Sequence, residues 1–332
     1  MSSIFDRFEL ASFKRMYNNA KAVHEYSGKN TLFILLDMGM CIMRDHIGYM
    51  EYNLFHFAGK SKEKRATYVT FDYSQYLFRT LNDKEHIDGF NDKLRFNVMF
   101  KDLLGRDFLD IGKSSYEDFE AFCKGKKIFF CKPADSCSGQ GIYRNIEFDE
   151  NSDLKKIYEY LKENSLFVED TILQHPEMKK LNPTSINTVR ITTVLDKNDE
   201  AHVMYAIQRI GTGNRSVDNV GAGGIYTVLS NEGKIVNPCW SDKTISTYTV
   251  HPDTGMELIG FKVPYFKEAV ELCKNAALVD KHVRYVGWDI AICEKGPVIV
   301  EGNPLPGYDM PQNYFVTGKD TGLKPDFERL LS

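Results

Sequence analysis

The chain has 332 residues, of which 42% are hydrophobic and 27% are charged, and its formal net charge is −4. This composition is typical of a globular protein with a sizeable core, and it excludes long disordered tracts. A nucleic-acid partner favours a clustered basic surface, so the slightly acidic balance predicts no such partner.

Residues 1–90 have the pattern of a mostly helical region. Helical periodicity runs through residues 4–26 and 31–44, and residues 68–71 have the composition of a strand. Apolar and basic side chains are interleaved over residues 4–16, as in a core-packing helix or in a helix that lies on a membrane surface. Core packing is the more frequent outcome and is the one we expect.

The next part of the chain combines helices with short strands. A helix is predicted from Asn91 onward, with Leu94, Val98, Leu103 and Leu104 on one face. The other predicted elements are strands at 128–131, 142–148 and 166–168 and a helix at 154–161. A glycine- and serine-rich loop joins the first two strands, so we expect them to form a hairpin.

From residue 184 onward the sequence is rich in β-strand patterns. Alternating apolar and polar residues predict an antiparallel sheet, which is followed by a helix and a final hairpin. These elements are predicted at residues 188–195, 202–209, 225–229, 263–279, 285–293 and 297–301. The short turn at residues 294–296 would make the last two strands antiparallel neighbours.

Three oxygen-bearing side chains lie in that final hairpin. Asp289 is in the first strand, and Glu301 and Asn303 are two positions apart in the second, so they point to the same face. Carboxylate and amide oxygens suit Mg²⁺, which takes one or two carboxylates together with phosphate oxygens and water. For these three residues alone, a solvated polar turn is the more frequent outcome, and the metal hypothesis therefore depends on the rest of the chain.

The glycine-rich loop has a lysine at its start. Lys132 precedes the loop, and Ser138, Gly139 and Gly141 lie within it. Backbone N–H groups of such a loop can line a polyphosphate, to which the lysine adds a point charge. No Walker A pattern is present, and an ordinary turn is the alternative.

The cysteines and histidines give weaker signals. The seven cysteines form no C-x-x-C pair and their number is odd, which favours reduced, buried thiols. Cys137 lies in the glycine-rich loop without an assignable partner, so a nucleophilic role is disfavoured. No H-x-x-x-H spacing occurs, which argues against zinc. His175 is left open between a substrate contact and a packed loop position.

The N-terminal sequence bears on the cellular compartment. It lacks the charged and then apolar pattern of a signal peptide. The most apolar early run, residues 32–36, is far shorter than the roughly 18 residues of a membrane span. We therefore expect a cytoplasmic protein without a membrane span.

In chain order, these elements resemble the ATP-grasp superfamily from about Asp92 to Gly307. Within it, the chain looks most like the sugar-transfer-associated ATP-grasp group, which is related to glutamate-ligase-like proteins. The segments that carry the resemblance are Asp92-Lys93, Lys132-Pro133 with the glycine loop, residues 167–172, Gln174-His175-Pro176, residues 185–190, Arg209, Asn219-x-x-x-Gly223-Gly224, and Asp289 with Glu301-x-Asn303-x-x-Pro306-Gly307.

The resemblance implies an α+β protein with the ATP-grasp fold, in which two α+β subdomains clasp ATP. We expect a mostly helical N-terminal region at residues 1–90 and a small lid subdomain with the glycine loop at residues 91–172. A large subdomain with an antiparallel sheet and the metal site would then cover residues 173–332.

The resemblance also implies a role for each candidate residue. Asp289, Glu301 and Asn303 would hold two Mg²⁺ ions. Arg190, Arg209 and Asn219 would act in catalysis, through their donors to the transferring phosphate or to the carboxylate substrate. A surface ion pair is the alternative for the two arginines. Nucleotide contacts are expected from Lys93, Lys132, Ser138, Gly139, Gly141, Glu169, Asp170 and Ile172, with the backbone of Glu169 and Ile172 at the adenine.

The implied reaction is ATP-dependent ligation of a carboxylate to an amine through an acyl phosphate, with release of ADP and phosphate. The substrates would be small molecules, such as an amino acid joined to a sugar acid or a peptide, in cell-surface polysaccharide or peptide-tag pathways. The alternatives are a kinase that phosphorylates a small-molecule hydroxyl and a non-catalytic nucleotide-binding protein. The sequence identifies neither substrate, and it leaves a homodimer open.

Overall fold

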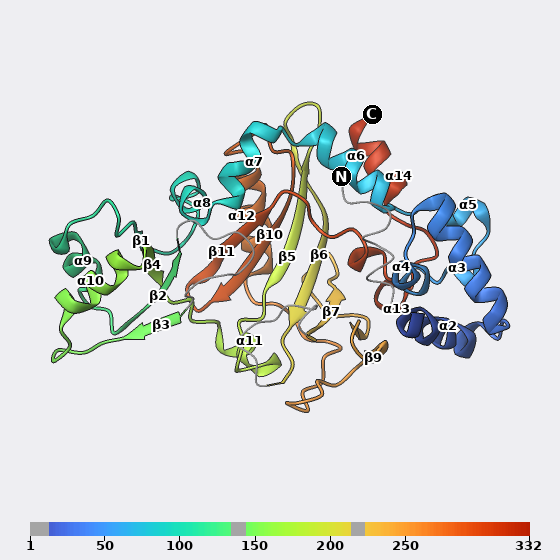
Figure 1. Ribbon diagram of the computed structural model, residues 1–332, viewed down its shortest axis with the longest axis horizontal. Helices are drawn as coiled ribbons and strands as arrows, with labels where there is room; N and C mark the ends of the chain where they lie inside the picture. Colours follow the sequence, from blue (N-terminus) through green and yellow to red (C-terminus); the bar gives the residue numbers. More distant parts are fainter. Residues whose placement is uncertain (1–12, 134–143, 214–222) are drawn as a thin grey trace.

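The structure of the protein is a computed structural model that describes residues 13–133, 144–213 and 223–332. Three parts follow one another along the long axis of the molecule: a small sheet, a large central sheet and a group of N-terminal helices (Figure 1). Within the described residues, no helix is both long enough and apolar enough to cross a membrane.

The described N-terminal part is helical, and residues 4–12 of the predicted helix at 4–26 lie outside the described residues. Its elements are α2 (Phe13–Ser27), α3 (Thr31–Asp45), α4 (Tyr49–Leu54), η1 (Phe57–Gly59), α5 (Lys62–Arg65), α6 (Phe71–Leu81) and α7 (Lys84–Asn91). Residues 68–71 are not a strand: residues 68–70 form a bend and a cap, and the Thr70 side chain begins α6 by accepting from the backbone N–H of Tyr73 at 3.4 Å. A capping threonine therefore prevails over strand propensity at this position.

The small sheet is antiparallel and contains the predicted hairpin. The elements of this part are α8 (Lys93–Met99), β1 (Phe108–Leu109), α9 (Tyr116–Cys123), β2 (Ile128–Pro133), β3 (Arg144–Glu147), α10 (Leu154–Glu163) and β4 (Leu166–Asp170). The strand order is β1-β4-β2-β3. Helices α9 and α10 bury Phe119 and Leu161 against Phe129 and Val168 of the sheet.

One part of the predicted helix after Asn91 is wrong. Val98 was expected to share the apolar face of α8, but its side chain is 62% exposed. Phe96 and Phe100 are buried instead, while Leu104, which was predicted on this face, is buried as expected. These three residues repeat every four positions, and the stripe they form is displaced from the predicted one because it follows the aromatic side chains.

The large sheet is also antiparallel and has seven strands in the order β11-β10-β5-β6-β7-β8-β9. The elements of this part are α11 (Pro176–Leu181), β5 (Val189–Leu195), β6 (Ala201–Ile210), β7 (Ile225–Val228), β8 (Cys239–Ser241), β9 (Ser246–Tyr248), α12 (Phe266–Ala277), β10 (Tyr285–Cys293), β11 (Gly296–Asn303), η3 (Met310–Gln312), α13 (Tyr314–Thr317) and α14 (Lys324–Leu331). The predicted strands and the final hairpin are confirmed.

The two faces of this sheet pack against different layers. Alternation along β5 sends Val189 and Ile191 into a core that also holds residues of α8 and α12. Arg190 lies between them and so points to the opposite face. On that face, Tyr205 and Tyr226 pack with N-terminal residues in a second core. The polar site described next therefore lies on the face that the N-terminal helices partly cover.

The cysteines agree with a reduced protein. Six of them lie in the described ranges, and none of these six is in a disulfide. Burial raises the pKa of the Cys123 thiol to about 11 and that of Cys239 to about 12, so both thiols stay protonated at neutral pH. Cys137 lies outside the described residues.

Candidate active site

A carboxylate and two arginines form the centre of the polar face. Asp289 on β10 is paired in register with Arg190 on β5 and with Glu301 on β11. Arg190 donates from Nε and Nη2 to the two oxygens of Asp289 at 2.7 and 2.8 Å, and Arg209 donates from Nη1 at 2.8 Å. The structure thus brings four predicted site residues together from four strands.

The charges of this cluster are strongly coupled. Asp289 is 4% exposed. Desolvation would raise the pKa of Asp289, but Arg190 and Arg209 more than offset it, so the pKa is lowered and the group stays ionised. Desolvation and the neighbouring Asp289 raise the pKa of Glu301. Unlike Asp289, Glu301 is exposed to solvent.

The donor set of this cluster fits a divalent cation. A carboxylate offers about four lone-pair sites, and the two arginines use three of those on Asp289. Glu301 forms no ion pair with any described lysine or arginine. The Asn303 side-chain oxygen accepts from the backbone N–H of Leu305 at 3.0 Å, which leaves it one further lone pair. Carboxylate and amide oxygens with open lone pairs are the ligands that Mg²⁺ takes.

A second buried charge cluster lies in the small sheet. Lys132 on β2 donates to Glu169 on β4 at 2.8 Å. Arg106 and Asn97 donate to the other Glu169 oxygen at 3.3 and 3.1 Å. The Glu169 and Arg106 side chains are only 5% and 3% exposed. Burial lowers the pKa of Lys132, Glu169 opposes this effect, and Arg106 and Lys93 add to it. Lys132 and Arg106 therefore share one carboxylate, which leaves an excess of positive charge in a buried position.

Arg106 joins the two clusters. Besides Glu169, its guanidinium donates to the backbone carbonyls of Ile299 and Val300, the second at 3.4 Å. Val300 immediately precedes Glu301 on β11. Arg106 therefore contacts β4 of the small sheet and β11 of the large sheet, which are neighbouring parts of the molecule in Figure 1. A triphosphate that contacted both clusters would have to lie at this junction.

The remaining predicted nucleotide residues lie nearby but are differently engaged. Lys93 begins α8 and is close enough to lower the pKa of Lys132. The Asp170 carboxylate accepts from Lys126 at 3.0 Å and from the backbone N–H of Asp107 at 3.0 Å, so it is tied into the small sheet. Ile172 is half-buried in the segment after β4. Ser138, Gly139, Gly141 and Asn219 lie outside the described residues.

The segment between the two sheets is held by a buried amide network. Gln174 donates to the carbonyls of Asn182 and Ser185 at 3.1 and 2.8 Å, and it accepts from the backbone N–H of Asn187 at 3.0 Å. His175 caps α11, because its Nδ1 accepts from the backbone N–H of Glu177 at 3.1 Å. This part of the sequence motif therefore sets the path of the chain into β5, and His175 has a structural role.

Sequence reasoning missed several polar residues of this site. Asn97 and Arg106 carry no local motif, and only their approach to Glu169 reveals them. Asp242 and Asp309 were also missed. Burial raises the pKa of both, and each carboxylate lies within electrostatic reach of the other. Asp309 also lies within electrostatic reach of Arg190, so the polar face continues from Arg190 to Asp309 and on to Asp242.

Asp242→Asn is expected to stabilise the folded protein at pH 8 by about 2 kcal/mol and to have little effect at pH 4. Burial, together with Asp309, raises the pKa of Asp242 to about 6. The native state therefore holds a proton that the unfolded state has already released, and stability is lost as the pH rises from about 4 to 6. Asparagine can still accept the Trp240 indole N–H, now bonded at 2.8 Å. Urea unfolding at the two pH values measures the effect, and equal shifts at both would contradict it.

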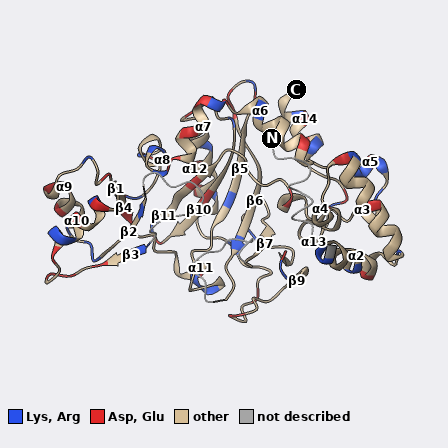
Figure 2. Ribbon diagram, viewed as in Figure 1, with Lys and Arg blue, Asp and Glu red and all other residues tan. Residues whose placement is uncertain are grey.

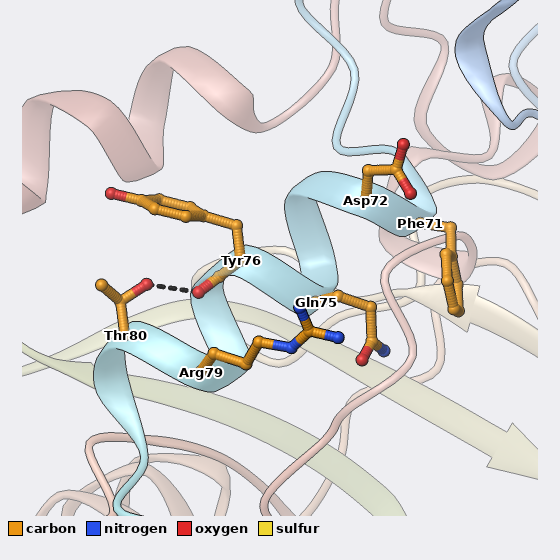
Figure 3. Close-up of a pocket in the computed structure, with 6 residues that line it drawn as sticks. All are labelled: Phe71, Asp72, Gln75, Tyr76, Arg79 and Thr80. Atoms are coloured by element: carbon orange, nitrogen blue, oxygen red, sulfur yellow. Dashed lines mark hydrogen bonds between the residues drawn. The ribbon is translucent and has the colours of Figure 1, made fainter. Parts of the chain in front are cut away.

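A hollow of about 390 Å³ lies elsewhere, on the surface of α6. Figure 3 shows its lining residues, with the Thr80 hydroxyl bonded to the Tyr76 carbonyl. The lining residues are Phe71, Asp72, Gln75, Tyr76, Arg79 and Thr80. None of them is a candidate site residue, and they come from a single helix, so the hollow is separate from the charge clusters.

The comparison with protein families agrees with this geometry. Residues 65–324 match the family described as sugar-transfer associated ATP-grasp. The match covers well over half of the chain, so the protein belongs to this family and has the ATP-grasp fold. No curated protein matches the chain.

Several solved structures show a distant likeness to the chain. The ligase PsnB, complexed with a phosphomimetic variant of its minimal precursor, Mg and ADP, is 15% identical over 75% of this chain and 61% of its own, with a TM-score of 0.41. The L-amino acid ligase from Bacillus licheniformis is 12% identical over 74% of this chain and 48% of its own, with a TM-score of 0.40. D-alanyl-alanine synthetase A from Vibrio cholerae is 13% identical over 73% of this chain and 63% of its own, with a TM-score of 0.42. The chain thus spans less than two thirds of each of these structures.

Proposed function

We propose that the protein is an ATP-dependent ligase that joins a carboxylate to an amine. The observation that carries the proposal is Arg106, which places the buried Lys132–Glu169 pair beside the strand that bears Glu301. A cationic cluster and a carboxylate cluster that one arginine connects are complementary to a nucleotide triphosphate and its metal ions. Membership of an ATP-grasp family supports the same interpretation.

The residues of the two clusters would bind different parts of the nucleotide and its metal ions. Lys132 and Lys93 would attract the phosphates, while Asp289, Glu301 and Asn303 would hold two Mg²⁺ ions. Bound there, the metal would neutralise charge on the transferring phosphoryl group. The backbone around Glu169 and Ile172 would receive the adenine. The Glu169 side chain is already bonded to Lys132, and it therefore orients that lysine rather than binding the base.

The proposed reaction has two steps. A substrate carboxylate oxygen attacks the γ-phosphorus of ATP, the bond to the bridging oxygen breaks, and an acyl phosphate and ADP result. An amine then attacks the acyl carbon, phosphate leaves, and the amine loses a proton. Arg190 and Arg209 are held by Asp289 with their guanidinium groups in the site, where their charge would stabilise the transferring group. Asn219 is proposed to assist them.

The substrates are proposed by chemical class. Given the family, we expect an amino acid to be joined to a sugar acid or a peptide. Asp309 lies within electrostatic reach of Arg190 and of Asp242, and an ammonium group that awaits the second step would find two carboxyl groups there as hydrogen-bond acceptors. The cytoplasm is the proposed location, because it supplies ATP.

Hydroxylamine trapping tests the proposal. The protein is incubated with ATP, Mg²⁺, hydroxylamine and a panel of amino acids and sugar acids, and ADP and hydroxamate are measured together. Carboxylate activation predicts both products in equal amounts with the correct acid. ADP with a phosphorylated alcohol and no hydroxamate would identify a kinase, and tight ATP binding without any ADP would identify a non-catalytic protein.

A further inference from the structure

Helix α3 exposes large apolar side chains along one side, which we call the apolar stripe. Its members and their exposed fractions are Leu32 (65%), Phe33 (71%), Leu36 (57%), Met40 (60%) and Met43 (82%). At about 100° per residue they fall within an arc of about 100°. The sixth exposed residue of α3 is Arg44, at the edge of this arc.

The fold itself does not require the apolar stripe. Ile34, Met38 and Cys41 occupy the opposite side of α3 and are buried among the N-terminal helices. A helix that packs on a core with one face normally presents polar residues on the other. A contiguous apolar patch on the surface of a folded protein marks a place of interaction.

The surroundings of the apolar stripe are basic. Residues 13–66 contain nine lysines and arginines and five acids, a net charge of +4 in a chain whose total is −4. Of the charged residues in this range that are exposed, seven are basic and two are acidic. Figure 2 shows basic residues on α2 and α5, the helices on either side of α3.

A hollow of about 410 Å³ lies at the C-terminal end of α3, where Arg44 and Asp45 line it. Its lining includes four basic residues, Arg44, Lys62, Arg65 and Lys324, with Asp45 as the acid among them. Arg44 belongs both to α3 and to the hollow. Arg65 on α5 bonds Asp37 on α3 at 2.7 Å, so the hollow is fixed beside the helix. A basic recess next to an apolar ridge is complementary to a phosphate headgroup and its acyl chain.

We propose that the apolar stripe and the basic hollow dock the protein on an anionic lipid surface. The stripe would enter the boundary between headgroups and acyl chains, and the basic residues would lie over lipid phosphates. A second copy of the chain fits less well. Two copies that met through this stripe would set the basic surroundings of one against those of the other, and like charges that face each other oppose association. The proposal is independent of the reaction proposed above.

Vesicle sedimentation of the full chain tests the docking surface. Vesicles of phosphatidylcholine alone are compared with vesicles that contain phosphatidylglycerol. The wild type is expected to bind the anionic vesicles and to be released by high salt. The double variant Phe33→Gln/Met40→Gln is expected to bind at least about tenfold more weakly. Both side chains lie outside the core, so its thermal unfolding should match that of the wild type.

A matched control uses exposed apolar residues elsewhere. Val236 and Ile259 are 50% and 45% exposed, and they lie outside the N-terminal helices. The double variant Val236→Gln/Ile259→Gln should bind like the wild type. A loss of binding in this control equal to that of the stripe variant would overturn the proposal, because binding would then reflect general hydrophobicity.

The basic hollow provides the second arm of the test. Arg44→Gln/Lys62→Gln should lose the preference for anionic vesicles while the apolar stripe is intact. Failure of the wild type to bind either kind of vesicle would overturn the proposal. So would a wild-type mass of two chains in solution that Phe33→Gln/Met40→Gln reduces to one, since the stripe would then join two copies.

Discussion

Glu301→Gln is expected to lower ADP release by about 10²- to 10³-fold while the protein stays folded. Glu301 is exposed to solvent, and it is paired with Asp289 on the neighbouring strand β10. Its charge repels that of Asp289, so replacing it with an amide relieves repulsion in the free protein. The loss would therefore lie in the bound state, where the carboxylate would face metal ions and phosphates.

Glu294 provides the control for this variant. It lies at the opposite end of the same hairpin, in the exposed turn between β10 and β11. Glu294→Gln should release ADP at the wild-type rate, and both variants should unfold at the wild-type urea concentration or above it. A Glu301→Gln protein with normal turnover would remove the metal role of this residue. Lost turnover with a lowered unfolding midpoint would show a structural role instead.

Glu169→Ala is expected to have the largest effect on stability, a loss of about 3 to 5 kcal/mol in the free energy of unfolding. The variant would leave Lys132 and Arg106 close together in a buried place with no carboxylate between them. Its effect should shrink on acidification. Lys132 and Arg106 hold the pKa of Glu169 below its ordinary value against desolvation. The stabilisation is therefore present at neutral pH and is lost as the pH falls.

Urea unfolding at several pH values measures this effect. Glu177→Ala is the control, because it breaks an ion pair with Lys180 whose side chains are 48% and 57% exposed. A pair of that kind contributes about 0 to 1 kcal/mol. The double variant Glu169→Ala/Lys132→Met should be less destabilised than Glu169→Ala alone, because one unpaired charge is removed. If Glu169→Ala is as stable as Glu177→Ala, water must replace the lost carboxylate, and the prediction is wrong.

Local sequence determined five strands of the large sheet and one part of the site, whereas the three-residue strands β8 and β9 were not predicted. The turn at residues 294–296 joins two apolar strands, so the pairing of Asp289 with Glu301 followed from short-range chemistry. The hairpin of β2 and β3 was predicted in the same way. Helix α14, whose proline lies near its start, was not predicted, because its eight residues carry too little periodicity.

Tertiary structure alone decided which charges meet. Arg190 and Asp289 are 99 positions apart, and they pair because β5 lies beside β10, an order that periodicity along either strand does not encode. Arg106 reaches Glu169 across 63 positions and Val300 across 194. Its role depends on how two sheets approach each other, and buried charges are held by partners that only the packed chain supplies. Short stretches of sequence determine the turns and the residue types of the site, whereas the contact of Arg106 with both clusters exists only in the folded chain.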